Sequence, residues 1–221
     1  MIPRTLIATT QIPGGDEMRL YRRGDDHMIL LERDELMSTR MSGSEEALAT
    51  MTADRLPRLA GSRWLIGGYG MGFTLRALLA RLPKDARVTV AELVPAIVDW
   101  ARGPMADLTA GCLDDPRVTV AIGDVAIPME AGGWDAILLD VDNGPDALVR
   151  AGNQWLYEPG GLAMARAALR PGGVLTIWSA ASNDRFTKTL RSARFEVEEQ
   201  VVRARSNGKG PRHHLWFARP R

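Results

Sequence analysis

The amino-acid sequence predicts an α/β fold: a doubly wound, mostly parallel sheet of seven strands with a small N-terminal β appendage. From residue 63 onward, short apolar runs alternate with amphipathic segments, which is the strand–helix rhythm of a parallel sheet. Two runs, ILLDV at 137–141 and VLTIW at 174–178, are nearly all apolar, as is typical of strands covered on both faces. The last two runs, 195–205 and 213–220, flank the turn-rich SNGKGP and predict an antiparallel hairpin at one edge of the sheet.

Residues that begin or end helices separate the expected elements. Pro83 ends the first helix of the repeating region, Pro95 begins the second, and Asn183 or Asp184 begins the last. The segment PGG at 171–173 is expected to end the helix before it. Strands are therefore expected at 63–67, 86–93, 116–124, 134–142, 173–180, 195–205 and 213–220, and helices at 73–82, 95–108, 162–170 and 183–193.

The first sixty residues have a different pattern. Residues 17–33 contain two alternating runs around Gly24-Asp25-Asp26, which predicts a β-hairpin. A helix is expected to begin near Ser44, which two glutamates follow, and to end at Pro57. We therefore expect residues 1–60 to form a small hairpin-plus-helix appendage, and residues 61–221 to form the main, ligand-binding domain.

Composition limits the class of protein. The chain has 221 residues, of which 45% are hydrophobic and 25% charged, as in ordinary globular domains. Its net charge of +1 gives no reason to expect nucleic acid or an anionic membrane as a partner. A single cysteine excludes an intrachain disulfide, and no cysteine–histidine cluster has zinc spacing, so no metal is expected. No segment has the length of a signal peptide core or a spanning helix, and we expect a cytoplasmic protein.

A cluster of glycines follows the first strand of the repeating region. Ligands of open α/β sheets bind outside the carboxyl ends of the strands. The segment GGYGMG, with Gly67, Gly68, Gly70 and Gly72, stands at such an end. Glycine lets a ligand approach the backbone closely, although a tight strand-to-helix packing turn would also need it.

Carboxylates follow the next strands. Glu92 ends the second strand about twenty residues after the glycine cluster, where an acid in a nucleoside-binding unit accepts hydrogen bonds from ribose hydroxyls. At the third strand end, Asp124 is suited to an exocyclic purine amine, with the Val125 amide beside the ring; a turn-forming role is the alternative for this aspartate. The fourth strand ends at Asp140 and Asp142, where partial burial would raise a pKa and favour proton abstraction, or where both acids serve a local turn.

Five sequence segments resemble the spermidine synthase (polyamine aminopropyltransferase) family, within the Rossmann-like class I S-adenosylmethionine-dependent methyltransferase fold. They are IGGYGMG, VAELVPAIVDWAR, DPRVTVAIGDV, WDAILLDVD and RAALRPGGVL, in this order, and the resemblance extends from about residue 28 to the C-terminus. It implies that an S-adenosyl sulfonium donor binds at Gly67, Gly68, Gly70, Gly72, Glu92, Leu93, Asp124 and Val125. It also implies that Asp140 is catalytic, deprotonating or orienting the attacking amine.

Two positions depart from the family pattern. The family's glycine loop usually carries an aspartate where this chain has Gly70, and that acid meets the amino end of decarboxylated S-adenosylmethionine. The family's second cleft acid corresponds to Asn143, and Asp142 is the residue nearest to replace it. The family's tyrosine and histidine on the substrate side are also not evident in STRMSGSEEALATM.

Several other residues are weaker candidates. Trp155 and Tyr157, on an expected lid loop, are proposed to contact the acceptor together with Asp142 and Asn143. Adjacent His213 and His214 on a strand point to opposite faces, so we expect packing or surface roles rather than joint ligation. Cys112 has no neighbour in the sequence that would ionise it, and we expect it to be inert.

The function expected from the resemblance is transfer of an aminopropyl group from decarboxylated S-adenosylmethionine to an amine. Because the acid at Gly70 is missing, methyl transfer from S-adenosylmethionine to a small molecule is the alternative, and a non-catalytic nucleoside-binding subunit is less favoured. The glycine cluster and Glu92 alone would also fit a nicotinamide dehydrogenase, but the chain lacks a second nucleotide-binding half. The sequence leaves open the identity of the acceptor and whether the chain forms a homodimer.

Overall fold

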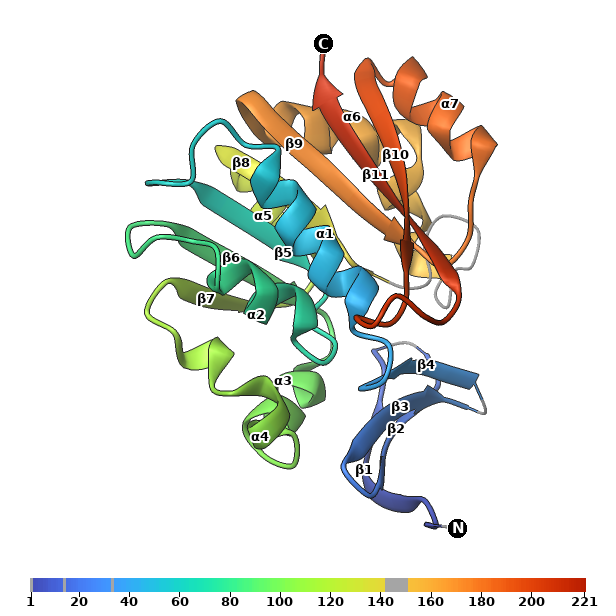
Figure 1. Ribbon diagram of the computed structural model, residues 1–221. Coiled ribbons are helices and arrows are strands. Elements are labelled where there is room, and N and C mark those ends of the chain that lie inside the picture. The colour runs from blue at the N-terminus through green and yellow to red at the C-terminus, as the bar shows by residue number, and fades with distance from the viewer. Residues whose placement is uncertain (1, 14, 33, 142–150) are drawn as a thin grey trace.

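The computed structural model describes residues 2–13, 15–32, 34–141 and 151–221. It contains a seven-stranded sheet in the order β10-β11-β9-β8-β5-β6-β7 (Figure 1). Strands β7, β6, β5, β8 and β9 are parallel, and β11 pairs antiparallel with both β9 and β10. The predicted α/β class, strand number and C-terminal hairpin are therefore confirmed. The strands are β5 (Arg63–Gly67), β6 (Arg87–Glu92), β7 (Val118–Ile122), β8 (Trp134–Leu139), β9 (Leu169–Ser179), β10 (Phe195–Arg203) and β11 (Arg212–Pro220).

Alternating side chains of the central strands build two cores, one on each face of the sheet. Trp64, Ile66 and Leu138 enter one core, whereas Leu65 and Ile137 enter the other. Helices α1, α2 and α3 cover the first core, and α5, α6 and α7 cover the second. The helices are α1 (Gly43–Asp54), α2 (Phe73–Leu79), α3 (Pro95–Arg102), α4 (Ala106–Thr109), α5 (Ala126–Ala131), α6 (Pro159–Ala168) and α7 (Asp184–Ser192), with 3₁₀ turns η1 (Cys112–Asp114) and η2 (Ala151–Tyr157).

The N-terminal strands form a separate antiparallel sheet. The predicted hairpin is present as β2 (Glu17–Arg23) and β3 (Asp26–Leu31), and Gly24 at φ 62° makes its turn. Two strands that the sequence does not predict flank it, β1 (Thr5–Gln11) and β4 (Asp34–Ser38). Met18, Leu20 and Ile29 from this sheet join the first core of the main sheet, so the two sheets share apolar packing.

Helix α1, expected as part of the N-terminal appendage, packs on the main sheet and crosses in front of its strands in Figure 1. The Thr52 and Thr176 hydroxyls are 2.9 Å apart, which joins α1 to β9. Arg55 pairs with Glu198 at 2.6 Å and lies over the Phe217 ring, 3.7 Å from its centroid. This packing fixes the first turn of α1 near the carboxyl ends of the strands.

Two expected helices differ from the structure. The helix expected at 95–108 is divided into α3 and α4, because Pro104 lacks an N–H group and interrupts helical hydrogen bonding. The segment PGG at 171–173 was predicted to end a helix, and this is wrong: α6 already ends at Ala168, and PGG lies inside β9. Pairing jumps there from Trp134↔Leu169 to Ala136↔Val174, so the extra residues form a bulge, which Gly172 at φ 78° accommodates.

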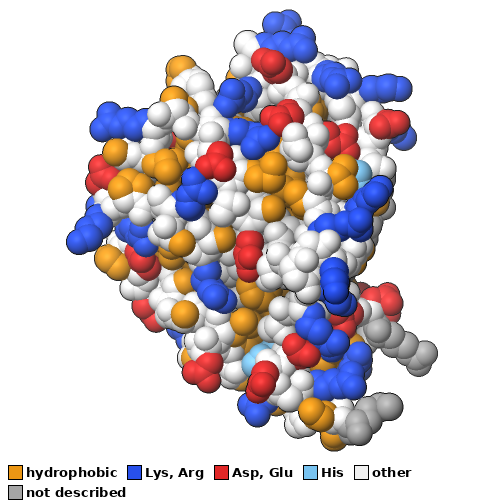
Figure 2. Space-filling view, viewed as in Figure 1, with side chains coloured by type: hydrophobic (Ala, Val, Ile, Leu, Met, Phe, Trp, Pro, Cys, Tyr) orange, Lys and Arg blue, Asp and Glu red, His pale blue; other side chains and the backbone are white. Residues whose placement is uncertain are grey.

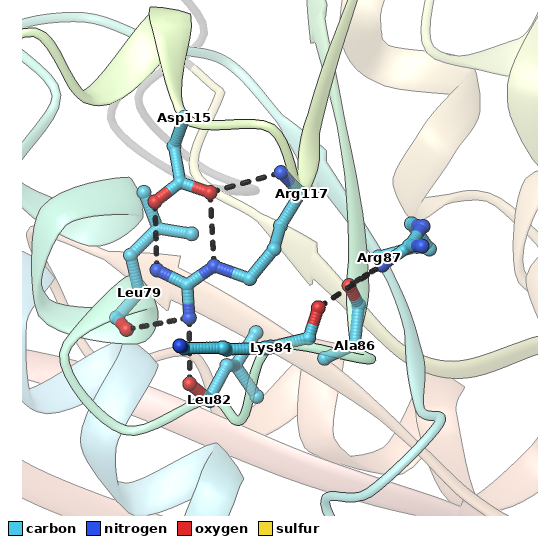
Figure 3. A network of polar contacts seen from close by, with 7 residues as sticks. All are labelled: Leu79, Leu82, Lys84, Ala86, Arg87, Asp115 and Arg117. Carbon is cyan, nitrogen blue, oxygen red and sulfur yellow. Dashed lines mark hydrogen bonds and ion pairs between the residues drawn. The ribbon is translucent and has the colours of Figure 1, made fainter.

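A partly buried ion pair joins the segment just before β7 to the end of α2 (Figure 3). Two guanidinium nitrogens of Arg117 donate to the two carboxylate oxygens of Asp115, at 2.9 and 2.8 Å. The third donates to the carbonyls of Leu79 and Leu82, at 3.0 and 2.6 Å, which would otherwise lack helical partners.

On the surface, acidic and basic side chains are interspersed over the face shown in Figure 2, in keeping with the small net charge.

Candidate active site

A cavity lies at the carboxyl ends of β5, β6, β7 and β8, between the two sheets. We call it the main cavity. Its floor includes Gly68, Gly70, Glu92, Asp124 and Asp140. Its roof is apolar and comes chiefly from the N-terminal segment, with Ile12, Met18, Leu36 and Met37. Four strand ends that are separate in the sequence thus meet at one cavity, as the topology predicts.

The glycines after β5 have two kinds of role. Gly68 and Gly70 line the main cavity, with φ values of 88° and 57° that favour glycine. A Cβ atom at Gly68 would lie 2.4 Å from the Asp140 carbonyl oxygen, so this backbone passes directly beside the end of β8. Gly67 instead packs under Val125, and Gly72, at φ 78°, leaves space for the Tyr69 ring.

Glu92 joins the loop after β5 to the loop after β6 through hydrogen bonds. One carboxylate oxygen accepts from the Tyr69 backbone N–H and the other from the Val94 N–H, both at 2.9 Å. The side chain is only 7% exposed, and burial raises its pKa, whereas the backbone hydrogen bonds lower it. Glu92 therefore holds the glycine loop in place and lines the main cavity.

The remaining predicted donor residues also reach this cavity. Leu93, Asp124 and Val125 line it. Oδ1 of Asp124 accepts from the Ala126 N–H at 2.8 Å, so this aspartate takes part in a local turn while its side chain remains exposed. Val125 is buried against Gly67.

Asp140 lies where the main cavity meets a smaller neighbour, which we call the side cavity. The side cavity is lined by Leu36, Met37, Glu45, Tyr69, Gly70, Met71, Phe73, Asp140 and Trp178. The Thr74 hydroxyl donates to Oδ2 of Asp140 at 2.7 Å. Burial raises the pKa of Asp140 to about 6, while the Thr74 hydrogen bond lowers it. Asp142 and Asn143 lie outside the described residues.

Glu45 is a site residue that sequence reasoning missed. It stands in the first turn of α1, where an acid is ordinary, and only the packing of α1 brings it to the side cavity. The Ser44 hydroxyl donates to Glu45 Oε2 at 2.7 Å, and the same hydroxyl oxygen lies 2.8 Å from His213 Nδ1. Burial, and then the charge of Asp140, raise the pKa of Glu45 to about 8.

Trp155 and Tyr157, which the sequence proposes as acceptor contacts, lie in apolar packing and are not among the residues that line the main cavity. Tyr157 is buried: its ring packs edge-on against Phe186, and its hydroxyl donates to the Val141 carbonyl at 3.1 Å. Trp155 packs against the same core. These contacts place both aromatic residues in the packing beneath η2, whereas Asn153 and Leu156 from this turn line the main cavity.

The histidines have separate partners, as their positions on a strand predict. His213 contacts Ser44 and lies edge-on against Trp178, whereas His214 lies 2.7 Å from Glu199. Cys112 is buried beside the Tyr69 hydroxyl, and burial raises its pKa. Within the described ranges, no group of three His, Cys, Asp or Glu side chains could hold a metal ion. No helix among the described residues is long and apolar enough to span a membrane.

Comparison with known proteins shows that the chain is similar to proteins named polyamine aminopropyltransferase. No family model matches the chain. The polyamine aminopropyltransferase of Mycobacterium tuberculosis is 33% identical over 196 residues, covering 83% of this chain and 34% of that protein. The Corynebacterium efficiens protein of the same name is 32% identical over 167 residues, covering 73% and 30%. The chain therefore spans about a third of the length of these curated relatives.

Solved structures show the same fold. Spermidine synthase from Thermotoga maritima superposes with a TM-score of 0.73 at 17% identity, covering 96% of this chain and 71% of that chain. A spermidine synthase in complex with the transition-state analogue AdoDATO gives a TM-score of 0.72, also at 17% identity, with the same coverage. These structures confirm the predicted fold, and the curated relatives confirm the predicted resemblance to the spermidine synthase family.

Proposed function

We propose that this chain transfers an aminopropyl group from decarboxylated S-adenosylmethionine to an amine acceptor, as a cytoplasmic enzyme. The observation that carries the proposal is the position of Asp140, where the main and side cavities meet, beside the glycine loop. Similarity to proteins named polyamine aminopropyltransferase supports it. We assign the catalytic and donor-binding roles to residues 61–221, and the cavity roof to the N-terminal sheet.

The donor would occupy the main cavity. Gly68 and Gly70 allow its nucleoside to approach the backbone, and Glu92 accepts from the ribose hydroxyls. Asp124 accepts from the adenine amine, with Leu93 and Val125 beside the ring. The apolar roof suits this donor, because the donor carries no phosphate and its positively charged sulfur becomes neutral in the reaction.

The reaction is an in-line displacement. The acceptor nitrogen attacks the propyl carbon bonded to sulfur, the new C–N bond forms, and the C–S bond breaks, with its electron pair going to sulfur. Methylthioadenosine leaves, and the proton of the alkylated nitrogen passes to Asp140. The raised pKa of Asp140 makes it a better proton acceptor than an ordinary aspartate while keeping it ionised at neutral pH. Alignment of the two reactants and exclusion of water provide the remaining rate acceleration.

Methyl transfer from S-adenosylmethionine is the second candidate, and Gly70 favours it. Without an acid at this position, the glycine loop itself has no group that selects a donor lacking the carboxylate. Calorimetric titration with decarboxylated S-adenosylmethionine, S-adenosylmethionine, methylthioadenosine and S-adenosylhomocysteine separates the two. Tight methylthioadenosine with weak S-adenosylhomocysteine supports aminopropyl transfer, the reverse supports methyl transfer, and failure of all four to bind overturns both. Asp140→Asn should then retain nucleoside binding but slow turnover.

A further inference from the structure

The side cavity contains a carboxylate that compensates for the missing acid of the glycine loop. We infer that Glu45 receives the protonated amino end of the donor's three-carbon chain, in place of the acid that the loop lacks at Gly70. This inference rests on the proposed function and goes further, because it assigns donor selection to a residue of α1.

The geometry supports Glu45 in the role of the acid that is missing at Gly70. Glu45 and Gly70 line the same side cavity, although one belongs to α1 and the other to the loop after β5. Thr74 lies between the two residues: its hydroxyl is 2.7 Å from Oδ2 of Asp140 and 3.4 Å from the backbone carbonyl oxygen of Glu45. A donor chain that leaves the main cavity past Asp140 would therefore end beside Glu45.

Charge also favours a cation at this place. The side-cavity lining given above, taken from the described residues, contains two carboxylates and no lysine or arginine. Burial raises the pKa of Glu45 most, followed by the charge of Asp140 and then, less, by that of Glu46 on the same helix. Tyr69 in the cavity wall and His213 beyond Ser44 are the other titratable groups, and the Tyr69 hydroxyl contacts Cys112 instead. Before a ligand binds, Glu45 and Asp140 together therefore retain one proton near neutral pH. A bound ammonium group would displace that proton.

Ser44 and His213 hold Glu45 in position. Ser44 has one hydroxyl proton and donates it to Glu45, so its oxygen accepts from Nδ1–H of His213. Burial, and then the nearby His214, lower the pKa of His213, which keeps this ring neutral. Its edge-on contact with Trp178, 4.7 Å between centroids, fixes the ring plane. Glu45 is thus oriented by packed side chains before any ligand arrives.

Two ligands that differ only in the three-carbon chain test this inference. Decarboxylated S-adenosylmethionine carries the aminopropyl group, and methylthioadenosine lacks it. Glu45→Gln should raise the dissociation constant of the first about 10- to 100-fold and leave the second unchanged. The matched control is Glu46→Gln, which makes the same change at the next residue of α1 and should alter neither. The double variant Glu45→Gln/Gly70→Asp should recover binding of the first ligand, because it returns an acid to the side cavity.

A measurement on the wild-type protein provides a test that needs no variant. Calorimetry at neutral pH in two buffers of different ionisation enthalpy should show proton release on binding of decarboxylated S-adenosylmethionine but not of methylthioadenosine. Equal proton release with both ligands, or equal weakening of both by Glu45→Gln, would overturn the inference while leaving the nucleoside site in place. If the wild-type protein binds neither ligand, the proposed function fails and the inference fails with it.

Discussion

The hydroxyl of Thr74 at the start of α2 donates a 2.7 Å hydrogen bond to Oδ2 of Asp140 at the end of β8. Thr74 is buried, so this bond orients the carboxylate without competition from bulk water. It also lowers the pKa of Asp140 against the larger effect of burial. The pair therefore sets both the direction and the basicity of the proposed proton acceptor.

Thr74→Val removes that bond and keeps the side-chain shape. We expect kcat to fall about tenfold or more, because a hydrogen bond to a charged group contributes roughly 1.5 to 3 kcal/mol. The pKa of Asp140 should rise further, which moves the acidic limb of the pH–rate profile to higher pH. Methylthioadenosine affinity should be unchanged. The same substitution at Thr89 in β6, away from both cavities, serves as control, and an unshifted profile for Thr74→Val would contradict this role.

Gly68→Ala tests how closely the glycine loop approaches β8. The added Cβ would lie 2.4 Å from the Asp140 carbonyl oxygen, at a φ of 88°. Gly61→Ala is the matched control, since Gly61 has φ 69° and no atom within 4 Å of the added Cβ. Backbone strain alone costs about 1 to 3 kcal/mol, so Gly61→Ala should show that loss and Gly68→Ala a larger one in urea unfolding. Equal losses would show that the close approach has no energetic consequence.

Glu92→Gln should weaken both the fold and nucleoside binding. The amide NH₂ group would replace one oxygen and face either the Tyr69 or the Val94 backbone N–H, leaving a buried donor unpaired. This costs about 1 to 3 kcal/mol of unfolding free energy. Methylthioadenosine affinity should fall by at least about tenfold, because Glu92 then loses an acceptor for the ribose. The exposed Glu130 on α5 provides the control, and a Glu92→Gln protein of unchanged affinity would remove the ribose assignment.

The stability of the ligand-free protein should fall as the pH rises from about 5 to about 8 through the contribution of Glu45. Its folded-state pKa lies above the unfolded value, so the folded protein holds a proton that the unfolded chain has lost. The change in the free energy of unfolding that is due to Glu45 is at most about 1.4 kcal/mol per pH unit. Denaturant unfolding of Glu45→Gln should show a smaller decline with pH than the wild type, whereas Glu46→Gln should stay close to the wild type, because the charge of Glu46 is the smallest of the named effects on the pKa of Glu45. Parallel curves for all three proteins would exclude a raised pKa at Glu45.

The parts of the site that were predictable from sequence are those that topology alone determines. Gly68, Glu92, Asp124 and Asp140 each end or follow a parallel strand, and parallel strands of one sheet end at the same edge. Glu45 was not predictable in this way, because its position depends on how α1 crosses the sheet, which involves contacts far apart in the sequence.

The structure also departs from the local sequence signal at two places. The PGG segment at 171–173 has the composition of a helix end but forms a bulge, because Leu169 already pairs with Trp134. Tyr157 was expected on a lid loop next to the acceptor, and the apolar surface beneath η2 buries its ring. In both cases tertiary pairing or burial outweighs the local signal.

The central claim is tested most directly by mass spectrometry of the products formed from decarboxylated S-adenosylmethionine and diaminobutane. We predict equal amounts of methylthioadenosine and aminopropyl-diaminobutane, with much slower formation by Asp140→Asn. In a parallel reaction, S-adenosylmethionine should yield no S-adenosylhomocysteine. No aminopropylated amine from the first reaction, together with accumulation of S-adenosylhomocysteine in the second, would contradict aminopropyl transfer and establish a methyltransferase instead.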